Sequence, residues 1–85
     1  MNRRKKQWLF FREGGDLIGK ALLIEIKDSL TASALYRQAL DKFLLAVKTD
    51  STHKRLGLYL PDLYSKLHQM DAAAYWRNWL GPLAQ

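Results

Sequence analysis

The stretch SLTASALYRQALDKFLLAVK, residues 29–48, carries the clearest secondary-structure signal in the chain. Its apolar side chains recur every three or four residues, the period of an α-helix, and the charged side chains lie off that stripe. The stripe consists of Ala32, Leu35, Tyr36, Ala39, Leu40, Phe43 and Val47. We expect Ser29 or Thr31 to be the N-cap, because a hydroxyl there can accept a hydrogen bond from a free backbone N–H. The pattern predicts a core helix.

The stretch before this helix, residues 7–27, has two interpretations that both use Gly14 and Gly15 as a break. In the first, a short helix ends at Arg12, and Asp16 caps a second helix. In the second, residues 13–16 form the turn of a β-hairpin, because the flanking aromatic and β-branched side chains suit strands. The sequence leaves both open.

The stretch after the core helix predicts a short strand followed by two helices. Leucines alternate with other residues over 55–60, which is typical of extended backbone. Pro61 suits the first turn of a helix, which we expect to run to Leu67. Asp71 is expected to cap a last helix, which Gly81 and the following proline end.

These elements predict a mainly α fold of about four helices. The alternative is α+β, with an N-terminal hairpin and the short strand near 55–60. Because 85 residues support one core, we expect a single compact domain over residues 7–85, preceded by a basic arm, residues 1–6. A chain this short with three tryptophans and four tyrosines has apolar surface to spare, so a homodimer is expected.

Composition also bears on location. Lys20, Glu25, Lys27 and Asp28 interrupt the longest apolar run, so integral membrane insertion is not expected. The apolar run after the basic start is too short for a signal peptide. The chain has no cysteine, which fits a cytoplasmic protein.

Positive charge is concentrated at the beginning of the chain. Residues 1–12 contain five Lys/Arg and no acid, whereas residues 13–85 hold nine Lys/Arg against eight Asp/Glu. A basic arm of this kind can neutralise phosphates and release their counterions, which gives salt-dependent affinity for nucleic acid. The other interpretation is a terminus that only aids solubility.

The stretch KRLGLYLPDLYSKL, residues 54–67, resembles the strand and first helix of ribbon-helix-helix DNA-binding proteins. The resemblance extends weakly to residue 80, and the strand would sit in mid-chain. Residues 33–40 resemble the second helix of the same family but precede the strand, so the elements lie out of the family's usual order. It implies that two chains pair their strands in the major groove of DNA. Arg55, Gly57 and Tyr59 would then face the DNA.

Two further possibilities involve the last helices. Residues 61–67 and 72–80 could form a helix-turn-helix, in which Arg77 contacts DNA. Alternatively, Tyr75, Trp76 and Trp79 could form an aromatic surface for a protein partner if they are exposed.

Catalysis is not expected. His53 and His68 have no metal-binding spacing with an acid pair, and the chain has no glycine-rich phosphate loop or nucleophile elbow, so neither a metal nor a cofactor is predicted. The sequence therefore predicts a small nucleic-acid-binding accessory or regulatory protein, for instance in transcription, that binds duplex DNA or an acidic protein partner. A protein-interaction module (an adaptor, complex subunit or small inhibitor) is the alternative. The predicted nucleic-acid contacts are Arg3, Arg4, Lys5, Lys6, Arg12, Lys54, Arg55, Tyr59 and Arg77.

Overall fold

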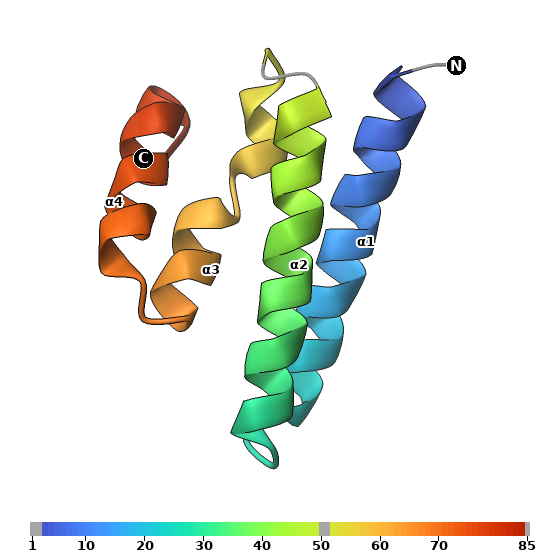
Figure 1. Ribbon diagram of the computed structural model, residues 1–85, viewed down its shortest axis with the longest axis vertical. Coiled ribbons are helices and arrows are strands. Elements are labelled where there is room, and N and C mark those ends of the chain that lie inside the picture. The colour runs from blue at the N-terminus through green and yellow to red at the C-terminus, as the bar shows by residue number, and fades with distance from the viewer. Residues whose placement is uncertain (1–2, 50–51, 85) are drawn as a thin grey trace.

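A computed structural model describes residues 3–49 and 52–84, which form four α-helices and two short 3₁₀ helices. The elements are α1 (Arg3–Ile24), α2 (Ser29–Thr49), η1 (Lys54–Gly57), α3 (Leu60–Lys66), α4 (Met70–Leu80) and η2 (Gly81–Ala84). The two long helices form an antiparallel hairpin, and the short α3 and α4 lie on the other side of α2 from α1 (Figure 1). The predicted mainly α fold is confirmed. The β-hairpin is wrong, because the described part of the chain contains no strand.

Both interpretations of residues 7–27 expected a break at Gly14 and Gly15, and both are wrong there. Helix α1 runs through the glycine pair without interruption. A Cβ on Gly14 would lie 2.9 Å from two ring atoms of Phe43, so the missing side chain lets α1 approach α2 closely. Gly14 therefore serves helix packing. Asp16 lies in the middle of α1 and caps nothing.

The predicted core helix is confirmed as α2, but its cap is Asp28. One carboxylate oxygen of Asp28 accepts a hydrogen bond from the backbone N–H of Thr31 at 3.0 Å, and the other accepts one from the Thr31 hydroxyl at 2.5 Å. These hydrogen bonds lower the pKa of Asp28. The expectation of Ser29 or Thr31 as the cap was wrong because Asp28 precedes both and its carboxylate reaches Thr31.

The predicted strand over 55–60 is also wrong. Residues 54–57 form η1, and Leu60 already begins α3. The leucines Leu56, Leu60, Leu63 and Leu67 recur at spacings of four, three and four residues, and all four are buried in the core. This helical pattern was hidden by the alternation of Leu56, Leu58 and Leu60. No extended segment remains there for the paired strand that the ribbon-helix-helix resemblance implies.

The predicted helix starting near Pro61 is confirmed as α3. The last helix is also confirmed, but it begins at Met70 after Gln69, which makes no side-chain capping hydrogen bond. Asp71 is therefore inside the first turn of α4 rather than its cap. Gly81 ends α4 with a φ of 59°, a left-handed conformation that glycine adopts without strain.

A polar cluster joins α3 to the hairpin. One oxygen of the Glu25 carboxylate accepts hydrogen bonds from the Lys66 ammonium and from the Tyr36 hydroxyl, each at 3.1 Å. The Lys66 ammonium also lies 5.1 Å from the centre of the Tyr36 ring. The hydrogen bond with Lys66, followed by that with Tyr36, lowers the pKa of Glu25. The same ion pair raises the pKa of Lys66.

Over residues 3–49 and 52–84, none of the helices has a long enough apolar stretch to span a bilayer.

Candidate nucleic-acid interface

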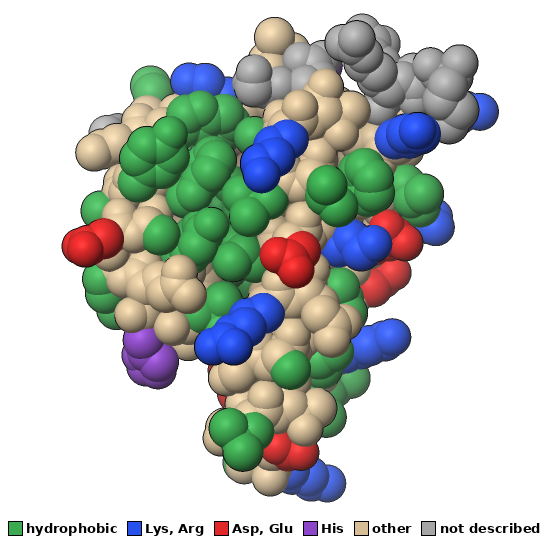
Figure 2. All heavy atoms as spheres, in the orientation of Figure 1, with side chains coloured by type: hydrophobic (Ala, Val, Ile, Leu, Met, Phe, Trp, Pro, Cys, Tyr) green, Lys and Arg blue, Asp and Glu red, His purple; other side chains and the backbone are tan. Residues whose placement is uncertain are grey.

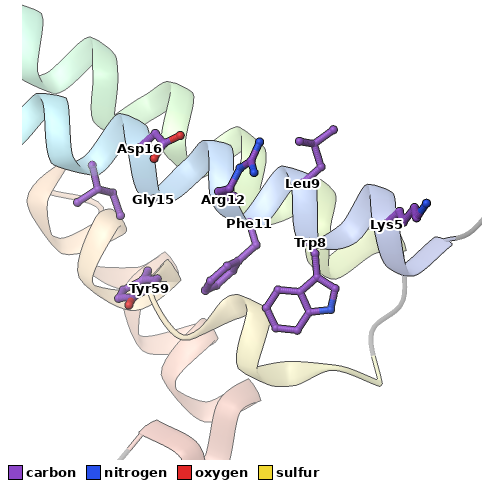
Figure 3. Close-up of a pocket in the computed structure, with 9 residues that line it drawn as sticks. Lys5, Trp8, Leu9, Phe11, Arg12, Gly15, Asp16 and Tyr59 are labelled. Carbon is purple, nitrogen blue, oxygen red and sulfur yellow. The ribbon is translucent and has the colours of Figure 1, made fainter.

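An open groove of about 950 Å³ lies along α1 and reaches Tyr59, which packs against Phe11 of that helix. We call it the basic-aromatic groove, and its lining consists of Lys5, Trp8, Leu9, Phe11, Arg12, Gly15, Asp16, Ile18 and Tyr59. All but one of these residues belong to α1, and Tyr59 comes from the turn between η1 and α3. Trp8 and Phe11 project from α1 on the side of Tyr59, whereas Arg12 and Asp16 lie along the other border (Figure 3).

The aromatic side chains of the groove are held in place by the core. Trp8 and Phe11 are one helical turn apart and pack edge to face, with ring centres 5.6 Å apart. Phe11 packs in turn against the buried Phe43 at 5.3 Å and against Tyr59 at 6.0 Å. Tyr59 also contacts Phe43, at 5.5 Å. Trp8 and Tyr59 nevertheless remain 54% and 46% exposed, so large ring surfaces face solvent in a fixed arrangement.

The cations of the groove lie on α1. Lys5 and Arg12 are both exposed, and they are about 10 Å apart along the helix axis. The first turn of α1 contains no acidic residue, although the N-terminal end of a helix carries a partial positive charge. Asp16 is the acid in the lining, about 16 Å along the axis from Lys5. The end of the groove nearest the helix start is therefore strongly positive.

A second, neighbouring hollow also includes Trp8. Its lining consists of Trp8, Thr52, His53, Lys54, Arg55, Leu56 and Leu83. The Lys54 ammonium donates a hydrogen bond to the Trp79 carbonyl at 3.0 Å and lies 5.1 Å from the centre of the Trp79 ring. Lys54 is thus engaged with the C-terminal end of α4, whereas Arg55 is exposed. Trp8 lies where the two depressions meet.

The structure brings together some of the nucleic-acid contacts predicted from the sequence. Lys5, Arg12 and Tyr59 share the basic-aromatic groove, and Lys54 and Arg55 share the hollow beside it. Two others, Lys6 on α1 and Arg77 on α4, are exposed but line neither. The backbone of Arg3 and Arg4 begins α1, but their side chains, like residues 1 and 2 of the predicted arm, lie outside the described part.

Trp8 was not predicted as a contact residue, although it lies at the centre of the site. Its signal in the sequence was an aromatic residue two positions after the four consecutive basic residues 3–6, with Gln7 between them. Trp8 also begins the short apolar run of residues 8–11, which is typical of a segment that packs in the core. Only the helical geometry separates a contact residue from a core residue here, because it turns Trp8 outward while Phe11 packs inward against Phe43.

The aromatic residues of α4 form a separate feature. Tyr75, Trp76 and Trp79 pack edge to face in sequence, with ring centres 5.3 and 5.1 Å apart. Tyr75 is 62% exposed, and the two tryptophans are half-buried. Hydrophobic side chains gather between α2 and α4 on the face that Figure 2 shows, while Lys and Arg side chains are spread over the same view with acidic ones among them.

An exposed apolar end of the hairpin was not anticipated from the sequence. Large aliphatic side chains surround the turn from α1 to α2, and they are Leu22, Leu23, Ile26 and Leu30. Leu23 is 84% exposed and Ile26 is 100% exposed. Such a group of solvent-facing aliphatic side chains is typical of a contact surface.

In the part of the chain that the structure covers, no group of three or more acidic or histidine side chains is arranged to hold a metal ion. Comparison of the chain with protein-family models, with curated proteins and with solved structures gave no match.

Proposed function

We propose that this chain is a small nucleic-acid-binding accessory or regulatory protein. Its main contacts are the basic residues at the start of α1 together with Arg12, and Arg55 adds a contact from the neighbouring hollow. The observation that supports the proposal best is the groove that combines Lys5 and Arg12 with the exposed rings of Trp8 and Tyr59. Cations for phosphates beside aromatic rings are the usual components of a nucleic-acid-binding surface.

The electrostatics of α1 support the same proposal. Residues 3–6 are all basic, and they occupy the helix end at which cations are unfavourable. This arrangement costs helix stability, and a bound polyanion would relieve the repulsion. A terminus that served solubility alone would gain nothing from placing its charges on this helix turn.

The contribution of Lys54 is reduced in this proposal, compared with the expectation from sequence. Its ammonium already has a carbonyl and an aromatic ring as partners. Moving it to a phosphate would break those contacts, so Arg55 is the better candidate of the two.

The proposal is tested by fluorescence anisotropy with a labelled DNA duplex. Binding should be detectable at about 50 mM salt and should weaken steeply by about 200 mM, because phosphate contacts release counterions. Arg12→Ala should reduce the slope of log affinity against log salt by about one. Lys20→Ala is the matched control, because Lys20 is an exposed cation of α1 outside the groove. If neither duplex nor single strands bind at low salt, the proposal is wrong.

A second candidate is a protein-interaction module that uses Tyr75, Trp76 and Trp79. The exposure of Tyr75 beside two half-buried tryptophans favours it, because aromatic clusters are frequent at the centre of protein interfaces. A partner that copurifies in stoichiometric amounts with the wild type and with Trp8→Ala, but not with Tyr75→Ala, would support this candidate. Copurification that survives Tyr75→Ala would count against it.

We also propose that the chain forms a homodimer through the apolar end of the hairpin. Two copies could bury Leu23 and Ile26 against each other, and these are among the most exposed aliphatic side chains of the chain. Sedimentation should therefore give a dimer for the wild type and a monomer for Ile26→Lys. A monomeric wild type would contradict this assignment.

A further inference from the structure

We infer that the basic-aromatic groove binds single-stranded nucleic acid, with bases stacked on Trp8 and Tyr59 and phosphates paired with Lys5 and Arg12. The inference rests on the proposed function and narrows it, from nucleic acid in general to strands whose bases are unpaired.

The first argument is the exposure of the aromatic rings. Trp8 and Tyr59 lie on either side of Phe11, and the buried Phe43 supports both Phe11 and Tyr59. The rings are therefore fixed by packing while about half of each side chain faces solvent. Rigid, solvent-facing rings are suited to receive another flat ring, because little conformational freedom is lost on binding.

The second argument is the difference between single and double strands. In a duplex the bases are stacked on one another and present only their edges in the grooves. An aromatic side chain can stack on such a base only after the base has been flipped out, which costs a few kcal/mol. Single strands present their ring faces directly, so stacking on Trp8 and Tyr59 favours them over a duplex.

The third argument is the arrangement of charge. Lys5 and Arg12 follow one another along α1, so a sugar-phosphate backbone can run beside the helix while its bases enter the groove. Asp16 would repel that backbone, which places the strand at the end of the groove near Lys5. Arg55, in the hollow on the other side of Trp8, extends the positive surface beyond the groove.

A helical peptide is the main competing occupant, because apolar residues dominate the lining. The charge of the site favours a polyanion instead. Four basic residues begin α1, and Lys5, Arg12 and Arg55 lie around Trp8, whereas Asp16 is the single acid among the residues that line the groove.

The experiment compares two labelled probes by fluorescence anisotropy at about 50 mM salt: an oligothymidylate of about 12 nucleotides and a duplex of similar length. The full-length chain should bind the single strand at least about tenfold more tightly than the duplex. This preference is the opposite of that expected from phosphate contacts alone, since a duplex carries the denser charge.

Variants then separate stacking from charge. Trp8→Ala should weaken single-strand binding about 5- to 150-fold, the range found for loss of one stacking side chain, with little change in the salt dependence. Trp8→Phe should restore most of this affinity. Tyr75→Ala is the matched control, because it removes an aromatic side chain of similar exposure outside the groove. Asp16→Asn should strengthen binding.

Because Trp8 lies at the surface, its alanine variant should remain folded, which circular dichroism can check. Tyr59 contacts the core ring of Phe43, so Tyr59→Leu provides a second variant that keeps apolar volume but loses the ring face. Should the wild type bind duplex and single strand equally, with Trp8→Ala as tight as wild type, the stacking inference is wrong and the proposed function stands. Absence of binding to both probes would overturn both.

Discussion

Gly14 in α1 lies directly against the ring of Phe43 in α2. A Cβ at this position would be 2.9 Å from both Cε2 and Cζ of Phe43, which is closer than carbon atoms pack. Phe43 is fully buried and contacts Phe11 and Tyr59, so it cannot move aside without disturbing the rings of the groove. The spacing of the two long helices thus depends on the absence of a single methyl group.

Gly14→Ala should therefore lower the free energy of unfolding by about 1–2 kcal/mol, because overpacking costs more than the gain in helix propensity returns. Urea denaturation measures this change. Gly19→Ala is the matched control, because a Cβ there meets nothing within 4 Å in the same helix. It should raise stability by about 0.5–1 kcal/mol. A stabilising effect of both substitutions would show that α1 and α2 can separate at no cost.

The cluster of Glu25, Lys66 and Tyr36 should make the stability of the fold depend on pH in the acidic range. Its hydrogen bonds lower the pKa of Glu25 in the folded chain, below its ordinary value of 4.5. The stabilisation is therefore present above pH 4.5 and is lost as the pH falls through the folded-state pKa. Thermal unfolding between neutral and acidic pH should show this loss, and Glu25→Gln should make the loss smaller. An identical pH profile for the variant would mean that the cluster contributes nothing.

The opposite behaviour is expected at alkaline pH. The hydrogen bond to Glu25 raises the pKa of Lys66 above its ordinary value of 10.5. Its stabilisation is present below that value and is lost as the pH rises through the folded-state pKa. Lys66→Met should remove this alkaline step in thermal unfolding while leaving nucleic-acid affinity unchanged. An alkaline step of undiminished size in the variant would assign it to other groups.

Replacement of Asp28 should destabilise the start of α2. Its carboxylate accepts both hydrogen bonds of Thr31, and Asp28→Ala leaves that backbone N–H to water. The melting temperature should fall at neutral pH, whereas Asp28→Asn should retain much of the capping. Ser29→Ala is the comparison that separates this cap from the one expected from sequence. An equal fall in melting temperature for Ser29→Ala and Asp28→Ala would contradict the assignment of Asp28 as the cap of α2.

Substitutions of the neighbouring residues Lys54 and Arg55 should have different effects on stability and on nucleic-acid binding. Lys54→Met should lower the free energy of unfolding by about 0.5–1 kcal/mol, because the ammonium lies over the ring of Trp79. Its effect on nucleic-acid binding should be small. Arg55→Met should weaken binding and leave stability nearly unchanged. Reversed effects would show that Lys54 leaves its partners to contact phosphate.

The sequence predicted the helices whose apolar period is unambiguous. The stripe from Ala32 to Val47 marked α2, and Pro61 and Gly81 marked the start of α3 and the end of α4. It failed at Gly14, because a glycine required for close packing looks the same in sequence as one required for a turn. It failed again at Leu58, where a local alternation concealed the helical spacing of Leu56, Leu60, Leu63 and Leu67.

The candidate site could be anticipated only in part. The sequence alone determined that positive charge is concentrated in the first twelve residues and that the chain is mostly helical, since both follow from composition and local period. Only the tertiary structure decided that Tyr59 comes to lie beside Phe11, and that Lys54 is engaged by α4 while Arg55 is not. Those relationships join residues 25 or more positions apart in the chain, so they depend on how whole helices pack and not on a local pattern of residue types.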